Sequence, residues 1–266
     1  ILKPDVNKSQ LNFVNQGENE ILYGLGAVKG LGKAAIENII SERERKPFEN
    51  LYDFCARVDL SKVDKRGIEP LIKCGAMDSF NLSRKEMLES LEDAMKYAKQ
   101  NTMTQESGIS DLFGGISESN DFIPVKKDKY DDFANSKFEF SALGFYLETH
   151  PVKEHYWELK KLGTGSIENV MEERVNTISG VIIRQNRIQT RRGPLVFATL
   201  DDGTDRIELV ISSEVLDSFE GNLSPQTIYI ASGDVTFEKD AQKKNIGLQK
   251  KMRVTDIKSL EEARMK

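Results

Sequence analysis

A glycine-rich run at residues 23–36, Y-G-L-G-A-V-K-G-L-G-K-A-A-I, carries residue types suited to binding an anion through the main chain. Gly30 and Gly32 allow backbone φ values that a side chain would forbid, and they let the main chain approach another backbone closely. The turn leads into a helix expected to begin near Lys33, where unsatisfied N–H groups and the helix dipole favour an anion. Backbone phosphates of nucleic acid fit this chemistry, and contacts to them carry no base sequence.

The run is a helix-hairpin-helix signature, because apolar residues at helical spacing follow the turn and Pro47 ends the pattern. A tight connection between two helices without any ligand is the alternative interpretation. The residues expected to contact DNA are Lys29, Gly30, Leu31, Gly32, Lys33 and Ala34.

A second hairpin is expected at residues 71–78, before a helix that opens with a capping box from Ser83 to Glu86. It has one hairpin glycine, Gly75, and both Gly67 and Pro70 interrupt the helix that leads into it. We therefore expect a mainly structural role, with candidate DNA contacts at Lys73, Gly75 and Ala76.

After residue 172 the pattern changes from helical to alternating, which predicts five strands at 177–188, 195–200, 206–211, 227–237 and 245–254. With one short helix at 213–219, this is an OB-fold pattern, which binds nucleic acid through strands two and three and two loops. Basic residues lie at those loops, Lys251 and Arg253 among them, and the alternative for them is an ordinary solvated surface. Phe197 could stack on a base, and the alternative is that it packs in the core. The candidate single-strand contacts are Arg184, Arg187, Arg191, Arg192, Phe197, Lys243, Lys244 and Lys250.

Catalytic and metal-binding residues are not expected in this sequence. Asp201 and Asp202 are adjacent and precede Gly203, so a turn role suffices for them. His150 and His155 lack neighbours at metal-ligand spacing, and Cys55 and Cys74 are expected to be buried and reduced.

The net charge of -5 is concentrated in an acidic segment between residues 101 and 150 that reads as an exposed connector. The sequence therefore predicts an α+β multidomain chain: an all-α tandem helix-hairpin-helix domain, a linker and a five-stranded OB-fold β-barrel. No apolar stretch is long enough to span a bilayer, so we expect a cytoplasmic protein without a membrane partner. The chain begins at Ile1 rather than at methionine, as expected of a fragment of a longer protein.

The order of motifs resembles the C-terminal part of the alpha subunit of bacterial replicative DNA polymerase III, of the DnaE type. The blocks that carry the resemblance are residues 1–9, 23–35, 71–78, 143–151 (L-G-F-Y-L-E-T-H-P) and 199–203 (T-L-D-D-G). The resemblance implies five regions: the end of the fingers at 1–20, the tandem helix-hairpin-helix domain at 21–100, a linker with a clamp-binding peptide at 101–172, the OB-fold at 173–258 and a tail at 259–266.

The resemblance also implies function. Duplex primer-template would bind the hairpins, and single-stranded template would bind the OB-fold. The polymerase aspartates and their Mg²⁺ would lie upstream of this fragment, which would hold no cofactor. The family carries a sliding-clamp peptide of the form Gln-x-x-Leu-Phe, to which Ile109, Ser110, Asp111, Leu112 and Phe113 correspond, with Ile109 in place of glutamine. The expected partners are DNA, the beta sliding clamp and other polymerase III holoenzyme subunits.

Three alternatives remain open at this point. One is the same region of an error-prone DnaE-type paralogue, and another is a DNA-repair enzyme such as a glycosylase or ligase, which would need a nucleophilic lysine with a partner carboxylate. The third is a protein-interaction scaffold without a direct nucleic-acid role.

Overall fold

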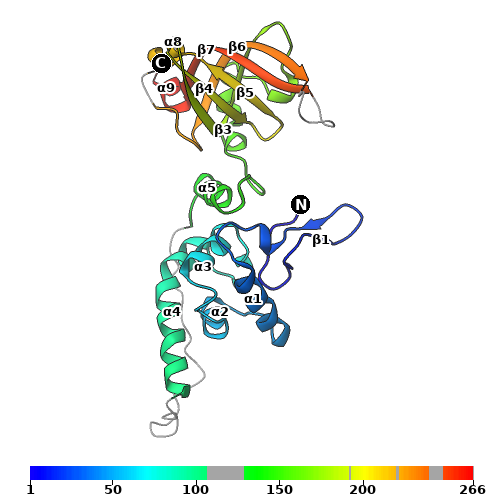
Figure 1. Cartoon of the computed structure of the whole chain (residues 1–266), viewed down its shortest axis with the longest axis vertical. Helices are drawn as coiled ribbons and strands as arrows, with labels where there is room; N and C mark the ends of the chain where they lie inside the picture. Colours follow the sequence, from blue (N-terminus) through cyan, green and yellow to red (C-terminus); the bar gives the residue numbers. More distant parts are fainter. Residues whose placement is uncertain (107–128, 192, 220–221, 240–247, 266) are drawn as a thin grey trace. The chain divides into compact units, whose positions relative to one another are not determined.

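A computed structural model describes residues 1–106, 129–191, 193–219, 222–239 and 248–265 (Figure 1). Contacts divide the chain into two compact units, Ile1–Glu148 and Thr149–Lys266. The clamp-like peptide at 109–113 lies outside the described residues, as do Arg192, Lys243 and Lys244.

The first unit is mainly helical. Its elements are β1 (Val14–Asn15), β2 (Ile21–Leu22), η1 (Leu25–Ala27), α1 (Lys33–Arg45), α2 (Leu51–Arg57), α3 (Lys65–Lys73), η2 (Asp78–Phe80), α4 (Arg84–Glu106) and α5 (Asp132–Leu143). The predicted helix from Lys33 is confirmed: Ile36 and Ile39 are buried, and the chain leaves helical geometry at Lys46, before Pro47.

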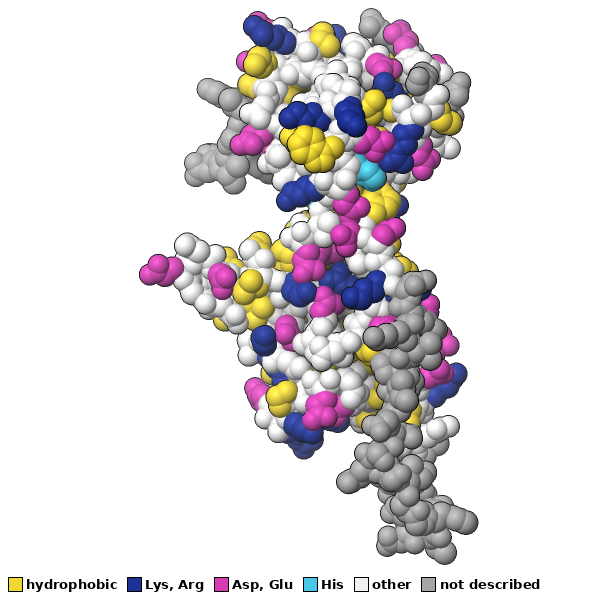
Figure 2. Space-filling view, turned by 180° about the vertical axis from the view of Figure 1, so that it is seen from behind, with side chains coloured by type: hydrophobic (Ala, Val, Ile, Leu, Met, Phe, Trp, Pro, Cys, Tyr) yellow, Lys and Arg dark blue, Asp and Glu magenta, His cyan; other side chains and the backbone are white. Residues whose placement is uncertain are grey.

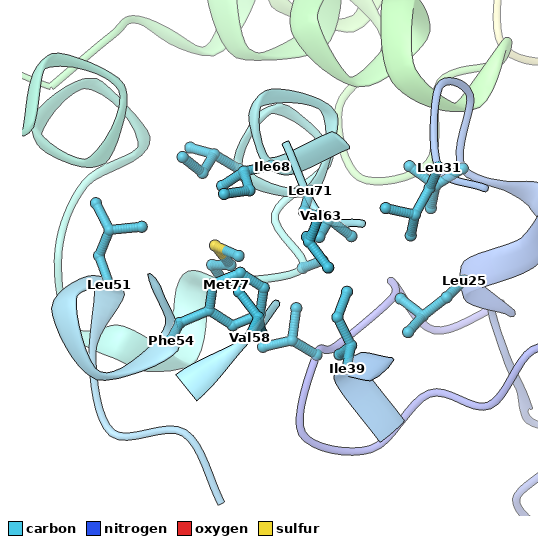
Figure 3. Packing of buried hydrophobic residues seen from close by; sticks show 14 of the residues in the cluster. Leu25, Leu31, Ile39, Leu51, Phe54, Val58, Val63, Ile68, Leu71 and Met77 are labelled. Atoms are coloured by element: carbon cyan, nitrogen blue, oxygen red, sulfur yellow. The ribbon is translucent and has the colours of Figure 1, made fainter. Parts of the chain in front are cut away.

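One hydrophobic core holds this unit together (Figure 3). Leu25, Ile39, Phe54, Ile68 and Met77 meet in it, although they come from segments far apart in the sequence. Helix α4 contributes one apolar face to this core, since Met87, Leu91, Ala94 and Ala98 are buried there. The two cysteines are free and buried as expected, and burial raises the pKa of each thiol to about 12.

A cluster of charges fixes the start of α4 to the rest of the first unit. The Arg84 guanidinium donates to the Asp78 carboxylate at 2.9 and 3.1 Å and to Glu148 at 2.8 Å, and its side chain is only 10% exposed. The Lys3 ammonium reaches the same two carboxylates at 2.7 and 2.9 Å. Burial alone would raise the pKa of Asp78, but Arg84 and Lys3 together hold it below its usual value.

The second unit is a barrel with short helices around it. Its elements are α6 (Pro151–Glu154), α7 (Tyr156–Lys161), η4 (Ile167–Asn169), β3 (Val175–Thr190), β4 (Gly193–Asp201), β5 (Arg206–Ile211), α8 (Ser213–Ser218), β6 (Ile228–Lys239), β7 (Leu248–Ser259) and α9 (Leu260–Arg264). The barrel closes in the order β3-β4-β5-β7-β6, with β5 and β7 parallel and the other pairs antiparallel.

The predicted fold class is therefore confirmed, and all five predicted strands are present. The third strand matches its predicted bounds, and Ile207, Leu209 and Ile211 are buried while the residues that alternate with them are more exposed. The predicted short helix after it is α8.

Replacing Arg84 with alanine should destabilise the first unit by about 2 kcal/mol. This is less than the ~3–5 kcal/mol expected for breaking a fully buried pair, because Glu148 is 42% exposed. Urea unfolding followed by circular dichroism measures it. Lys96→Ala, which removes an exposed 3.5 Å contact to Asp93 on the same helix, should change stability by less than about 0.5 kcal/mol. Equal effects of the two variants would contradict the assigned role of Arg84.

Candidate nucleic-acid interface

The hairpin between η1 and α1 turns at Gly30, which has a φ of +85°. A Cβ atom there would lie 3.3 Å from the Arg66 carbonyl oxygen, so both the conformation and the close approach to α3 favour glycine. Gly32 differs, because its φ is -80° and a Cβ atom would meet nothing within 4 Å. The prediction that both glycines need a forbidden φ is thus right for Gly30 and wrong for Gly32.

Gly32 is the N-cap of α1, and it leaves the start of that helix open. The first hydrogen bond of the helix runs from the Ile36 amide to the Gly32 carbonyl, so the amides of Lys33, Ala34 and Ala35 precede it. Within the described ranges these three amides have no hydrogen-bond acceptor, the first turn holds no acid, and no side chain caps the helix. Lys33 and Ala34 are exposed, so the positive end of the helix dipole faces outwards.

Other helices of the first unit have a side-chain cap that accepts one of their first amides. Asn50 caps α2, Asp64 caps α3 and Asp131 caps α5, each carboxylate or amide oxygen accepting a backbone N–H. The open start of α1 is therefore not a general property of this unit.

Two neighbouring helices hold the hairpin. The Lys29 amide donates to the Ala142 carbonyl of α5 at 2.9 Å, and the Lys29 ammonium lies 5.8 Å from the centre of the Phe140 ring. Leu31 is buried against α3, where Gly67 leaves room: a Cβ atom on Gly67 would lie 3.3 Å from the Leu31 side chain. The glycine within α3 therefore allows the hairpin to pack closely against this helix.

In the second hairpin, the backbone amides form the hydrogen bonds that end α3. Gly75, with a φ of +77°, donates to the Ile72 carbonyl, and Ala76 donates to Leu71, which together form a Schellman motif that ends α3. The predicted capping box is confirmed at α4, where Ser83 and Glu86 exchange hydrogen bonds. The amides of Gly75 and Ala76 are therefore used to end α3, and the helix that follows has a side-chain cap.

The basic residue of the second hairpin is also engaged. Lys73 pairs with Glu69 at 3.0 Å and lies 5.9 Å from the Phe138 ring centre. We therefore do not assign Lys73, Gly75 and Ala76 to the DNA-binding surface.

The register of the barrel assembles an outward face on β3, β4, β5 and β7. Val196, Ala198 and Leu200 of β4 are buried in the barrel, whereas the alternate residues Phe197 and Thr199 are half-buried and face outwards. Cross-strand partners share a face, so this surface has two rows. One row is Asn186, Phe197, Val210 and Arg253, and the other is Arg184, Thr199, Glu208 and Lys251.

The Phe197 ring and several basic side chains share this face. A single strand of nucleic acid needs both, because its bases stack on aromatic rings and its phosphates bind cations. Arg184 and Arg253 are exposed at its two sides, while Lys251 lies 3.6 Å from Glu208. Arg187 and Arg191 are exposed further along β3 and at the turn after it. The sequence did not reveal Asn186 and Val210, because only the pairing register places them beside Phe197. Thr199 follows Phe197 by two residues on the same strand and shares its face.

Lys250 has a structural position instead. Its ammonium pairs with Asp205 at 2.7 Å and donates to the carbonyls of Ile167 and Glu168 at 2.8 and 3.3 Å. Because its side chain is only 17% exposed and holds η4 against the barrel, we leave it out of the single-strand surface.

Asp201 and Asp202 serve the turn between β4 and β5, as predicted. Asp201 accepts the Gly203 amide at 2.9 Å and Arg206 at 2.7 Å, and Asp202 accepts the Thr204 amide at 2.8 Å. His150 joins them, since its Nδ1 accepts the Val152 amide while its Nε2 faces Asp201 Oδ1 at 3.3 Å. Two blocks that carried the resemblance, 143–151 and 199–203, therefore meet in this contact.

Among the described residues, no group of three or more His, Cys, Asp or Glu side chains has an arrangement that could hold a metal ion. A search of the same residues for helices found none with the length and apolar character that crossing a membrane requires.

In a comparison with known proteins, part of each unit matches a protein family. Residues 1–87 match a family described as a helix-hairpin-helix motif, and residues 177–260 match one described as an OB-fold nucleic acid binding domain. The match to a solved second OB-fold domain of replication protein A from Methanococcus maripaludis covers 37% of this chain and 95% of that domain, at 18% identity and with a TM-score of 0.29.

Relatives match the chain along nearly its full length. The DNA polymerase III subunit alpha of Pasteurella multocida is 33% identical over 272 residues, which are 99% of this chain and 23% of the relative. That of Escherichia coli K12 is 32% identical over 275 residues, 100% of this chain and 23% of the relative. The chain thus spans about a quarter of the length of these relatives, and the resemblance drawn from the sequence is confirmed.

Replacing Asp201 with asparagine should cost about 2 kcal/mol of stability at pH 7. Burial alone would raise the pKa of Asp201, but His150, Arg206 and the Gly203 amide lower it to about 2. A carboxylate whose pKa is depressed by folding stabilises the fold above its unfolded pKa of about 3.9 and loses that effect as the pH falls towards 2. Unfolding measured from pH 7 to pH 2 should show the difference between the two proteins shrinking below about pH 4. A difference that stays constant would contradict this assignment.

Proposed function

We propose that this chain, a homologue of part of the DNA polymerase III alpha subunit, is a non-catalytic region that holds primer-template DNA for a cytoplasmic replicative polymerase. The first unit would bind duplex, and the second would bind single-stranded template. The observation that carries the proposal is the open start of α1, where the amides of Lys33, Ala34 and Ala35 follow a glycine hairpin without a side-chain cap.

Duplex binding follows from the chemistry of that helix start. Main-chain N–H groups and the positive end of the helix dipole attract a phosphate oxygen, whatever the base sequence. Lys29 and Lys33 are exposed residues of the same hairpin and add positive charge to it, and Lys33 pairs with Glu37 at 3.6 Å. Contacts made by the main chain suit a protein that must slide along DNA of every sequence.

Single-strand binding is assigned to the face around Phe197. Its half-exposed ring offers a stacking surface, and Arg184 and Arg253 flank it within the two rows set by the strand register. Stacking does not distinguish bases, which again fits sequence-independent binding. Arg187, Arg191, Arg192, Lys243 and Lys244 would extend the basic surface.

Nucleotide addition would take place in other parts of the larger relatives. Phosphoryl transfer to DNA uses carboxylates that hold metal ions, and we assign the Mg²⁺ of the polymerase reaction to residues outside this chain. Asp201 and Asp202 are committed to turn amides.

A clamp contact completes the proposal. Leu112 and Phe113 are apolar anchors of the type that a short peptide buries in a groove of its partner, and the surrounding acidic segment would be repelled by DNA. The proposed partner of residues 109–113 is the beta sliding clamp, and other holoenzyme subunits would bind elsewhere.

Ala34→Glu should separate DNA binding from stability. An acid in the first turn of α1 favours the helix by about 0.3–1 kcal/mol through the dipole, yet it repels a phosphate at the same place. We expect duplex affinity to fall roughly tenfold or more while the unfolding midpoint stays unchanged or rises. Fluorescence anisotropy with labelled duplex and urea unfolding measure the two effects. Ser41→Glu adds the same charge to an exposed position later in α1 and should leave duplex affinity nearly unchanged; equal loss in both variants would refute the site.

Phe197→Ala should weaken binding of single-stranded DNA by about 1–3 kcal/mol, since stacking on an aromatic ring contributes that much for each base. Duplex binding should persist, because the hairpin lies in the other unit. Anisotropy titrations with oligothymidylate and with duplex test this difference. Tyr97→Ala, which removes a 38% exposed aromatic side chain from α4, is the control. Single-strand affinity that survives the loss of Phe197 would exclude this face.

Replacing Leu112 and Phe113 with alanine should abolish binding to the sliding clamp and leave DNA affinity within about twofold, because a few anchors carry most of the energy of a peptide contact. Surface plasmon resonance with immobilised clamp provides the measurement. Retained clamp binding by the double variant would place the contact elsewhere in the chain.

A further inference from the structure

Helix α7 presents two aromatic side chains to solvent, outside the barrel face around Phe197. Trp157 is 73% exposed and Tyr156 is 49% exposed, and their ring centres lie 5.2 Å apart at an interplanar angle of 76°. Figure 2 shows exposed hydrophobic side chains bordered by Lys and Arg side chains on the second unit. An indole is among the largest apolar groups in proteins, so exposing one in this way favours a binding role.

The exposure follows from how α7 is fixed. Leu159 is buried beneath the helix, and its carbonyl accepts the Thr164 hydroxyl at 2.9 Å. From α9, the Arg264 guanidinium donates to both carboxylate oxygens of Glu158, at 2.6 and 2.8 Å. These contacts orient the helix with its aromatic pair outwards, so the rings belong to a fixed platform rather than to a loose segment.

The charges around the rings suit an anionic ligand. The Lys160 ammonium lies 5.7 Å from the Tyr156 ring centre and 5.8 Å from that of Trp157, which is cation–π range for both. Lys153 and Lys161 are also exposed, as is Glu154, and Glu158 is neutralised by Arg264. A flat ring with an ammonium close to it can stack on a base while the ammonium meets the adjoining phosphate.

We propose that Trp157 is a second stacking site for an unpaired nucleotide, with Lys160 contacting its phosphate. The site rests on the proposed function for its class of ligand, single-stranded nucleic acid, but it uses residues of α7 rather than the barrel face. It would extend the length of single strand that the second unit holds.

Trp157 is the sole tryptophan of the chain, so its fluorescence reports on this site alone. The test titrates the whole chain with oligothymidylate and follows both tryptophan emission and the anisotropy of a labelled oligonucleotide. We expect emission to be quenched with the same saturation as the anisotropy change. Acrylamide should quench Trp157 readily in the free chain and less after the oligonucleotide is added.

Variants sharpen the result. Trp157→Ala should reduce single-strand affinity about tenfold, Trp157→Phe should retain most of it, and Lys160→Ala should reduce the slope of log affinity against log salt by about 0.7. If the oligonucleotide binds by anisotropy while tryptophan emission is unchanged, this second site is wrong and the proposed function stands. If the oligonucleotide does not bind at all, the single-strand part of the proposed function fails and this site fails with it. Protection of Trp157 from acrylamide in the free chain would also overturn the proposal.

Discussion

The start of α1 is the constraint on which the account of this chain depends. A helix begins with four N–H groups that lack partners in the helix itself, and a side-chain N-cap commonly satisfies one of them. Here the N-cap is Gly32, which leaves the amides of Lys33, Ala34 and Ala35 open. Glycine at an N-cap costs the helix only a few tenths of a kcal/mol relative to the best caps, so the open site is obtained with little loss of stability.

The surroundings of the hairpin hold this open end in place. Gly30 supplies the positive φ of the turn, Leu31 anchors it against α3, and the Lys29 amide ties it to α5. A helix start that is fixed before the ligand arrives pays less ordering entropy on binding. The second hairpin lacks this arrangement, because its amides end α3 and its following helix is capped. Two motifs that look alike in sequence therefore divide into one candidate binding element and one structural element.

The sequence revealed those parts of the structure that depend on local pattern. The helix from Lys33, the capping box at Ser83, the strand from Arg206 and the turn at Asp201 all follow from residue spacing, and each is confirmed. The contribution of α5 to the hairpin was missed, because a backbone contact between Lys29 and Ala142 leaves no mark on side-chain pattern. Asn186 and Val210 were missed for a similar reason, because only the register of β3 and β5 against β4 places them beside Phe197. The prediction for Gly32 was wrong because the sequence does not distinguish a glycine that adopts a positive φ, such as Gly30, from one in a conformation open to any residue.

The most direct test of the central claim is a nuclear magnetic resonance titration of the ¹⁵N-labelled chain with duplex DNA. The account predicts that the amide resonances of Lys33, Ala34 and Ala35 shift as a phosphate becomes their hydrogen-bond acceptor, while those of Gly75 and Ala76 stay in place. Duplex binding with no change at residues 33–35 would contradict it.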